Sequence, residues 1–153
     1  MGTVNRVLPV GLERTFAAIA DPATYPHWLV GAREIRSVDP AWPAPGTRFH
    51  HRVGLVGPLK VADATEVVEV EPPFLLVLDV RARPFLRARA TFHLAAAPAR
   101  VGDATVVTIH EVPIGPFAAL RPVVGPLTDL RNRRSLANLE DFLETGASHR
   151  APG

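Results

Sequence analysis

Apolar and polar residues alternate along most of the chain between residues 47 and 114. A period of two residues is typical of β-strands that are buried on one face. Glycine and proline interrupt the alternation, and the segments between these breaks are predicted strands at residues 47–55, 59–70, 74–82, 86–96 and 104–113. Residues 3–10 and 32–38 show a similar pattern, so the sequence predicts about seven strands in all.

Helical periodicity occurs in two other parts of the chain. Leu12, Phe16 and Ile19 share one helical face, which predicts a short helix over residues 12–20. Asp21 followed by Pro22 is typical of a helix start, and Pro26 should keep this second helix short.

A longer helix is predicted at the end of the chain. Pro122 and Pro126 should delay its regular part until about Leu127, and Gly146 is the glycine expected just past its end. We therefore expect one α+β domain over residues 1–146 and a frayed tail over 147–153. An antiparallel sheet of this size must bury one face, and only the C-terminal helix is long enough to cover it.

Hairpin geometry predicts the register of the sheet. Folding each strand back on the next places apolar residues on one face, whereas a slip of one residue would place Arg81, Arg87 and Arg89 there. The predicted neighbours are Leu55–Leu59, Phe49–Thr65, His51–Asp63, Asp63–Val80, Thr65–Leu78, Val80–Ala88, Leu78–Ala90, Ala90–Glu111 and Phe92–Ile109.

The C-terminal helix should point Asn132, Leu136, Leu139 and Leu143 toward this inner face. His51, Asp63, Thr65 and Glu111 are polar residues on the same face. Buried polar groups are costly unless they are paired, so the cluster predicts either a satisfied network or a wet cavity.

The composition of the chain argues against several kinds of site and segment. The chain of 153 residues is 47% hydrophobic and has no cysteine, which excludes disulfides, thiolate metal sites and cysteine nucleophiles. No apolar run is long enough to suggest a membrane span, and the start of the chain lacks the pattern of a secretory signal. We therefore expect a cytoplasmic protein.

The charge is less basic than the pI of 9.9 suggests. The net charge is only +2, and Lys60 is the only lysine among 17 basic residues. Nucleic-acid binders usually carry a dense basic stripe, so no nucleic-acid partner is expected.

The sequence resembles the START-like, pollen-allergen-like helix-grip superfamily, and in particular its polyketide cyclase/dehydrase (SRPBCC) branch. The segments that carry the resemblance cover nearly the whole chain: Leu8–Phe16 (LPVGLERTF), Ile19–Pro22 (IADP), Tyr25–Trp28 (YPHW), Pro45–Phe49 (PGTRF), Val67–Pro73 (VVEVEPP) and Asp103–Thr108 (DATVVT). The resemblance implies a sheet that grips the C-terminal helix, and an apolar or amphipathic small molecule bound in a cavity between them. It implies no universal catalytic motif and no cofactor.

Three functions follow as hypotheses. The first is binding of a hydrophobic small molecule, such as a polyketide, lipid or isoprenoid, by a monomer or a homodimer. The second is a cyclase or dehydratase in which His51, polarised by Asp63, removes a proton and Glu111 donates one. The third is a protein-interaction domain that uses the arginines of the outer sheet face.

Each candidate site residue also has a structural interpretation. His51 and Asp63 are also explained as a satisfied structural pair, and Glu111 as an acceptor for a donor such as Asn132. Asn132 would bind a ligand carbonyl or anchor the helix, and Tyr25 and Trp28 would gate the cavity or belong to the core. The remaining predicted ligand contacts are Phe49, Thr65, Leu78, Val80, Ala88, Ala90 and Leu136.

A metal site is not expected. His93 and His110 face outward on adjacent strands, and two histidines provide too few ligands.

Overall fold

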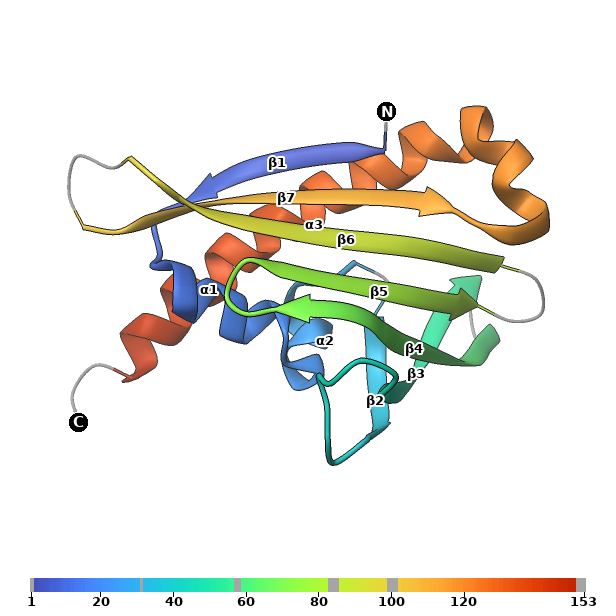
Figure 1. Ribbon diagram of the computed structural model, residues 1–153, viewed down its shortest axis with the longest axis horizontal. Helices are drawn as coiled ribbons and strands as arrows, with labels where there is room; N and C mark the ends of the chain where they lie inside the picture. Colours follow the sequence, from blue (N-terminus) through green and yellow to red (C-terminus); the bar gives the residue numbers. More distant parts are fainter. Residues whose placement is uncertain (1, 31, 57–58, 83–85, 99–101, 151–153) are drawn as a thin grey trace.

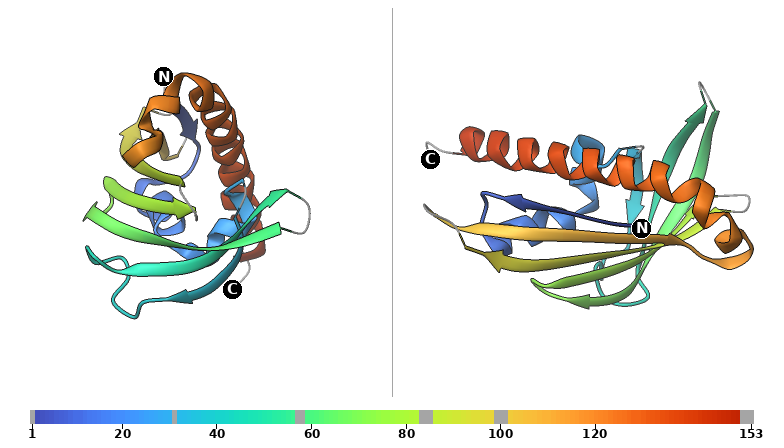
Figure 2. Two further views of the ribbon diagram at one scale, coloured as in Figure 1. Left: turned by 90° about the vertical axis from the view of Figure 1, so that its right-hand side faces the viewer. Right: turned by 90° about the horizontal axis from the view of Figure 1, so that it is seen from above.

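The computed structural model describes residues 2–30, 32–56, 59–82, 86–98 and 102–150. Its centre is a seven-stranded antiparallel sheet in the order β1-β7-β6-β5-β4-β3-β2. The sheet curves around one side of the long C-terminal helix α3, Arg121–Arg150 (Figures 1 and 2). The strands are β1 Thr3–Leu8, β2 Ala32–Val38, β3 Arg48–Val56, β4 Leu59–Glu71, β5 Leu75–Ala82, β6 Leu86–Ala97 and β7 Ala104–Pro113. The predicted α+β helix-grip architecture is confirmed.

The short helices after β1 form where the sequence predicts them. Helix α1, Leu12–Ile19, buries Phe16 and Ile19, which lie on its apolar face. The Asp21 carboxylate accepts a hydrogen bond from the Ala23 amide at 3.0 Å and starts a 3-10 turn, Pro22–Thr24. A separate short helix α2, Tyr25–Trp28, follows this turn directly. Pro26 lies in the first turn of α2, where the missing amide hydrogen of proline costs no hydrogen bond.

The predicted register is confirmed for three strand pairs. Phe49 lies opposite Thr65 and His51 opposite Asp63 between β3 and β4. Between β5 and β6 Val80 pairs with Ala88, and between β6 and β7 Ala90 pairs with Glu111. At the tip of the β3–β4 hairpin a register shift pairs Val56, rather than Leu55, with Leu59.

The predicted register of β4 and β5 is wrong by two residues. Thr65 pairs with Val80 and Val67 with Leu78, whereas we expected Asp63 opposite Val80 and Thr65 opposite Leu78. The turn between Glu71 and Leu75 contains three residues, and the register shifts again between Val67 and Glu69. Beyond the irregularity the displacement is an even number of residues, so Thr65 and Val67 still face inward.

Helix α3 begins earlier and ends later than predicted. A 3-10 segment η2, Gly115–Leu120, leads into the helix at Arg121. Pro122 lies in the first turn, where it costs no hydrogen bond, and Pro126 is accommodated inside the helix. Gly146 does not stop the helix, which continues to Arg150.

The core lies between the sheet, α1, α2 and the middle of α3. Its fully buried side chains include Leu8, Ile19, Trp28, Leu76, Val67, Val107, Ile109, Leu136 and Leu139. Among the helices that the structure describes, none combines the length and the apolar character needed to cross a membrane.

Candidate functional site

The inner face of the sheet is less completely covered at one end. On β5, Leu76 and Leu78 are buried but Val80 is half-buried. On β6, Ala90 is buried whereas Ala88 is half-buried.

Strand β7 follows this trend, because Ile109 is buried whereas Glu111 and Pro113 are half-buried. The pairings Val80–Ala88 and Ala88–Pro113 bring the three strands together at that end. Figure 1 shows η2 at this end of the sheet and α1 toward the opposite end. Val80, Ala88 and Pro113 are therefore less completely covered than Leu78, Ala90 and Ile109, at the end of the sheet where the side chains of β6 are small.

A polar cluster joins the sheet to α3 near this end. Asn132, which is 1% exposed, donates its amide hydrogen to Glu111 Oε1 at 3.4 Å. Arg131 forms an ion pair with the other carboxylate oxygen of Glu111. The Glu111 side chain is only 14% exposed. A carboxylate that is largely buried needs a partner of opposite charge, and Arg131 on α3 provides it.

This cluster matches the structural interpretation of Glu111 as an acceptor for Asn132. Arg131 was missed from the sequence, because helical periodicity places it beside the apolar stripe rather than within it. Its Nε atom is buried and makes no hydrogen bond. A buried donor of this kind is normally satisfied by an ordered water or by a bound molecule.

The backbones of His51 and Asp63 pair across β3 and β4, as the hairpin register predicts. Their backbones are described and their side chains lie outside what the structure describes. The pairing places the two residues on the same face of the sheet, which is the arrangement that both the catalytic and the structural interpretation require.

Tyr25 and Trp28 belong to a buried aromatic cluster. The ring of Tyr25 lies edge-on to Trp28 at 5.4 Å and to Phe49 at 5.5 Å. The Tyr25 hydroxyl donates to the Ile19 carbonyl at 2.6 Å, and Trp28 Nε1 donates to Thr24 Oγ1 at 3.0 Å. Burial, together with the negative charge of Asp21, raises the pKa of the Tyr25 hydroxyl.

Trp42 also belongs to this aromatic cluster, although it lies in the proline-rich segment between β2 and β3 (DPAWPAPG, residues 39–46). Its indole donates to the Ala20 carbonyl at 2.7 Å, and its ring lies 5.0 Å from that of Phe49. The cluster thus fixes the loop after β2 against the short helices. No periodic signal identifies a core residue in a loop.

The other predicted ligand contacts lie along the inner face. Thr65, Leu78, Ala90 and Leu136 are buried, and Val80 and Ala88 are half-buried. The structure brings Thr65 beside Val80 and Phe49, because these residues pair across three neighbouring strands.

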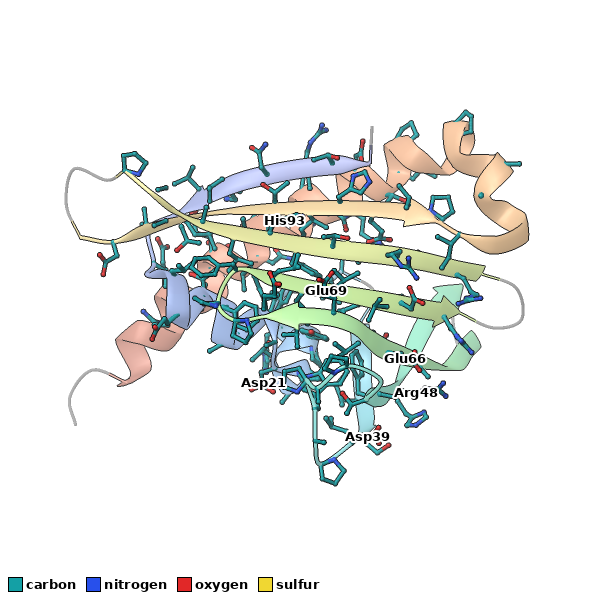
Figure 3. The ribbon with its side chains drawn as sticks, in the orientation of Figure 1. Asp21, Asp39, Arg48, Glu66, Glu69 and His93 are labelled. Carbon is teal, nitrogen blue, oxygen red and sulfur yellow. The ribbon has the colours of Figure 1, made fainter. Side chains whose placement is uncertain are left out.

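The outer face carries an ordered set of charges. Arg89 donates to Asp79 Oδ1 at 2.8 Å, and Arg87 lies 3.6 Å from Asp79 Oδ2. The hydrogen bond and charge of Asp79 raise the pKa of Arg89. On β3 and β4, Arg48 Nε lies 2.6 Å from Glu66 Oε1, and Figure 3 labels both residues. Asp79 therefore neutralises part of the arginine face that the interaction hypothesis uses.

The outward histidines have ordinary roles. His110 Nδ1 is 2.7 Å from Thr3 Oγ1 on the neighbouring strand, and His93 is exposed on β6 (Figure 3). Within the described ranges, no group of three His, Asp or Glu side chains is placed to hold a metal ion.

Comparison with family models shows the family of this chain, and comparison with solved structures shows its fold. The model of the family described as polyketide cyclase / dehydrase and lipid transport matches residues 2–144. A search of curated proteins finds no match.

Solved structures share the fold at low sequence identity. A Nitrosomonas europaea protein is 18% identical with a TM-score of 0.69, and the match covers 94% of each chain. A Mesorhizobium loti protein is 21% identical with a TM-score of 0.66, covering 94% of this chain and 96% of the other. A Staphylococcus aureus protein of unknown function has a TM-score of 0.69 at 7% identity, covering 95% and 94%.

Proposed function

Because the chain belongs to the polyketide cyclase/dehydrase and lipid transport family, we propose that it binds a hydrophobic or amphipathic small molecule between the sheet and α3. One observation carries the proposal: Val80, Ala88 and Pro113 are adjacent apolar residues on the inner face, and all three are only half-buried. Valine and alanine are among the residues most often fully buried, so their incomplete cover on the inner face supports an open apolar site. A ligand at this end of the sheet would remove their remaining apolar surface from water.

The polar cluster beside this surface suggests how such a ligand is oriented. A molecule lying along Ala88 and Ala90 would approach Glu111 through the Ala90–Glu111 pair. Asn132 and the buried Arg131 Nε would then provide hydrogen bonds for a carbonyl or hydroxyl oxygen. We therefore favour an amphipathic molecule, such as a polyketide- or isoprenoid-like compound with one oxygenated end, over a pure hydrocarbon.

Mass spectrometry of the purified protein tests this proposal. Native spectra are expected to show a fraction with a bound small molecule, and organic extraction should release a compound with a long apolar part. A protein that carries no such compound, and that binds none from a panel of polyketides, fatty acids and isoprenoid quinones, would contradict the proposal.

A second candidate function is catalysis of the cyclase or dehydratase type. It is favoured by the direct pairing of His51 and Asp63, since a carboxylate beside an imidazole orients it as a base. In this proposal His51 removes a proton from the bound ligand, and Glu111 returns one to the leaving oxygen. Glu111 would first have to release Arg131 and Asn132 and take up a proton from solvent, because a carboxylate paired with an arginine carries no proton to donate.

Substitution of His51 separates the two functions. A carrier should bind its ligand equally well when His51 is replaced by alanine, whereas an enzyme should bind but lose turnover. Asp63→Asn serves as a second variant, because it keeps the shape while removing the negative charge that orients the base. Unchanged turnover in both variants would exclude this mechanism.

A further inference from the structure

The first half of α3 carries an exposed apolar surface. Leu127 is 69% exposed and Leu130 is 63% exposed, and Pro126 beside them is exposed as well. Leucines this exposed occur singly on many surfaces, but these two are three residues apart and therefore neighbours on one helical face. We call Pro126, Leu127, Leu130, Arg133 and Arg134 the Leu127 patch.

The charge around this patch has one sign. Arg133 and Arg134 are exposed on the same half of the helix. From Val112 to Thr128 the sequence contains no acidic residue. The acidic residues at both ends of that segment are engaged inside the fold, since Glu111 pairs with Arg131 and Asp129 accepts a hydrogen bond from the Gly2 amide.

The second half of the helix has the opposite character. Glu140 pairs with Arg6 at 3.2 Å, and Asp141 and Glu144 are exposed. The helix therefore presents an apolar and basic half followed by an acidic half. Such an asymmetry favours contact with a negatively charged surface at one end of the molecule.

We propose that the Leu127 patch docks on an anionic lipid surface. The leucines would enter the boundary between headgroups and acyl chains, and the two arginines would lie at the level of the lipid phosphates. The patch follows η2, which lies at the same end of the sheet as half-buried Val80 and Ala88 (Figure 1). Docking there would bring the incompletely covered inner face close to the lipid. The proposal stands on the surface alone and does not require the small-molecule function to be correct.

Sedimentation with lipid vesicles tests the proposal. The full chain should bind vesicles made of equal parts phosphatidylglycerol and phosphatidylcholine, and should bind pure phosphatidylcholine much more weakly. Replacing both leucines with glutamine (L127Q/L130Q) should lower the partition coefficient at least tenfold. Each of R133Q and R134Q should lower it about fivefold at low salt, because a basic residue at an anionic surface contributes about 1 kcal/mol.

Matched variants elsewhere provide the controls. Val7 is 55% exposed on β1, and Arg81 is exposed on β5, so V7Q and R81Q remove the same chemistry from other surfaces. Neither should change vesicle binding. Failure of the full chain to bind anionic vesicles, or equal losses in V7Q and L127Q/L130Q, would overturn the proposal.

Self-association is the competing use of this surface. If sedimentation velocity shows a dimer that L127Q/L130Q dissociates, and vesicle binding is absent, the patch is an interface between copies of the chain and the lipid proposal is wrong.

Discussion

The amide of Asn132 on α3 lies 3.4 Å from Glu111 Oε1 on β7 and so links the helix to the sheet it covers. Asn132 is 1% exposed, which leaves few other partners for its amide group. A buried polar group that loses its partner costs about 1–3 kcal/mol. We therefore expect the hydrogen bond between Asn132 and Glu111 to stabilise the fold, in addition to lying beside the proposed ligand.

A double-mutant cycle measures this contact. We expect Asn132→Ala and Glu111→Ala each to lower the free energy of unfolding by about 1–3 kcal/mol. The double variant should lose about 0.5–1.5 kcal/mol less than the sum of the two, because each single change already breaks the same bond. Urea denaturation supplies all four values. Strictly additive losses would show that the two side chains do not interact in solution.

The buried hydroxyl group of Tyr25 should make the protein less stable at alkaline pH. Burial, aided by the charge of Asp21, raises the pKa of its hydroxyl in the folded protein. An unfolded tyrosine titrates near pH 10, so the stabilisation is complete below about pH 10 and is lost as the pH rises further. The free energy of unfolding should fall above that pH by up to about 1.4 kcal/mol per pH unit.

Tyr25→Phe is the control for this pH dependence. Tyr25 is the only tyrosine, so tyrosinate absorbance reports this residue alone. The phenylalanine variant should be less stable at neutral pH, because the Ile19 carbonyl loses its donor, and should lack the additional alkaline slope. Parallel slopes for the two proteins, or ionisation of Tyr25 near pH 10 without unfolding, would contradict the buried position.

Two leucines of α3 should respond differently to truncation. Leu136 is 1% exposed and lies in the core, so Leu136→Ala should cost about 2–5 kcal/mol of unfolding free energy. Leu130 is 63% exposed, and Leu130→Ala should change stability by no more than about 0.5 kcal/mol. Thermal denaturation of the two variants compares them directly. Similar losses would mean that the helix is rotated relative to the sheet.

Much of this arrangement could be predicted from the sequence. The alternation of apolar residues placed Glu111 opposite Ala90, and helical spacing placed Asn132 toward the sheet. These predictions succeeded because period and hairpin geometry are local properties of the chain. The contact between Asn132 and Glu111 could then be expected, because the helix was predicted to cover the inner face of the sheet.

Other features depend on interactions that local patterns do not contain. The position of Asp63 relative to Val80 was wrong because the three-residue turn after Glu71 and the irregularity near Val68 shift the register by two residues. The early start of α3 was missed because proline is tolerated in a first turn, and Pro126 is carried inside the helix. Arg131 and Trp42 make contacts over long sequence separations, which no periodicity reveals.

The most direct measurement is titration of the protein with an apolar fluorescent probe, anilinonaphthalene sulfonate, in the wild type and two variants of β6. Ala88 is half-buried on the inner face, whereas Ala95 is exposed on the same strand at a position of opposite orientation. Ala88→Phe fills the proposed site and should weaken saturable binding at least tenfold, and Ala95→Phe should leave it unchanged. If the wild type shows no saturable binding, or if both variants bind as it does, the proposed site between the sheet and α3 is wrong.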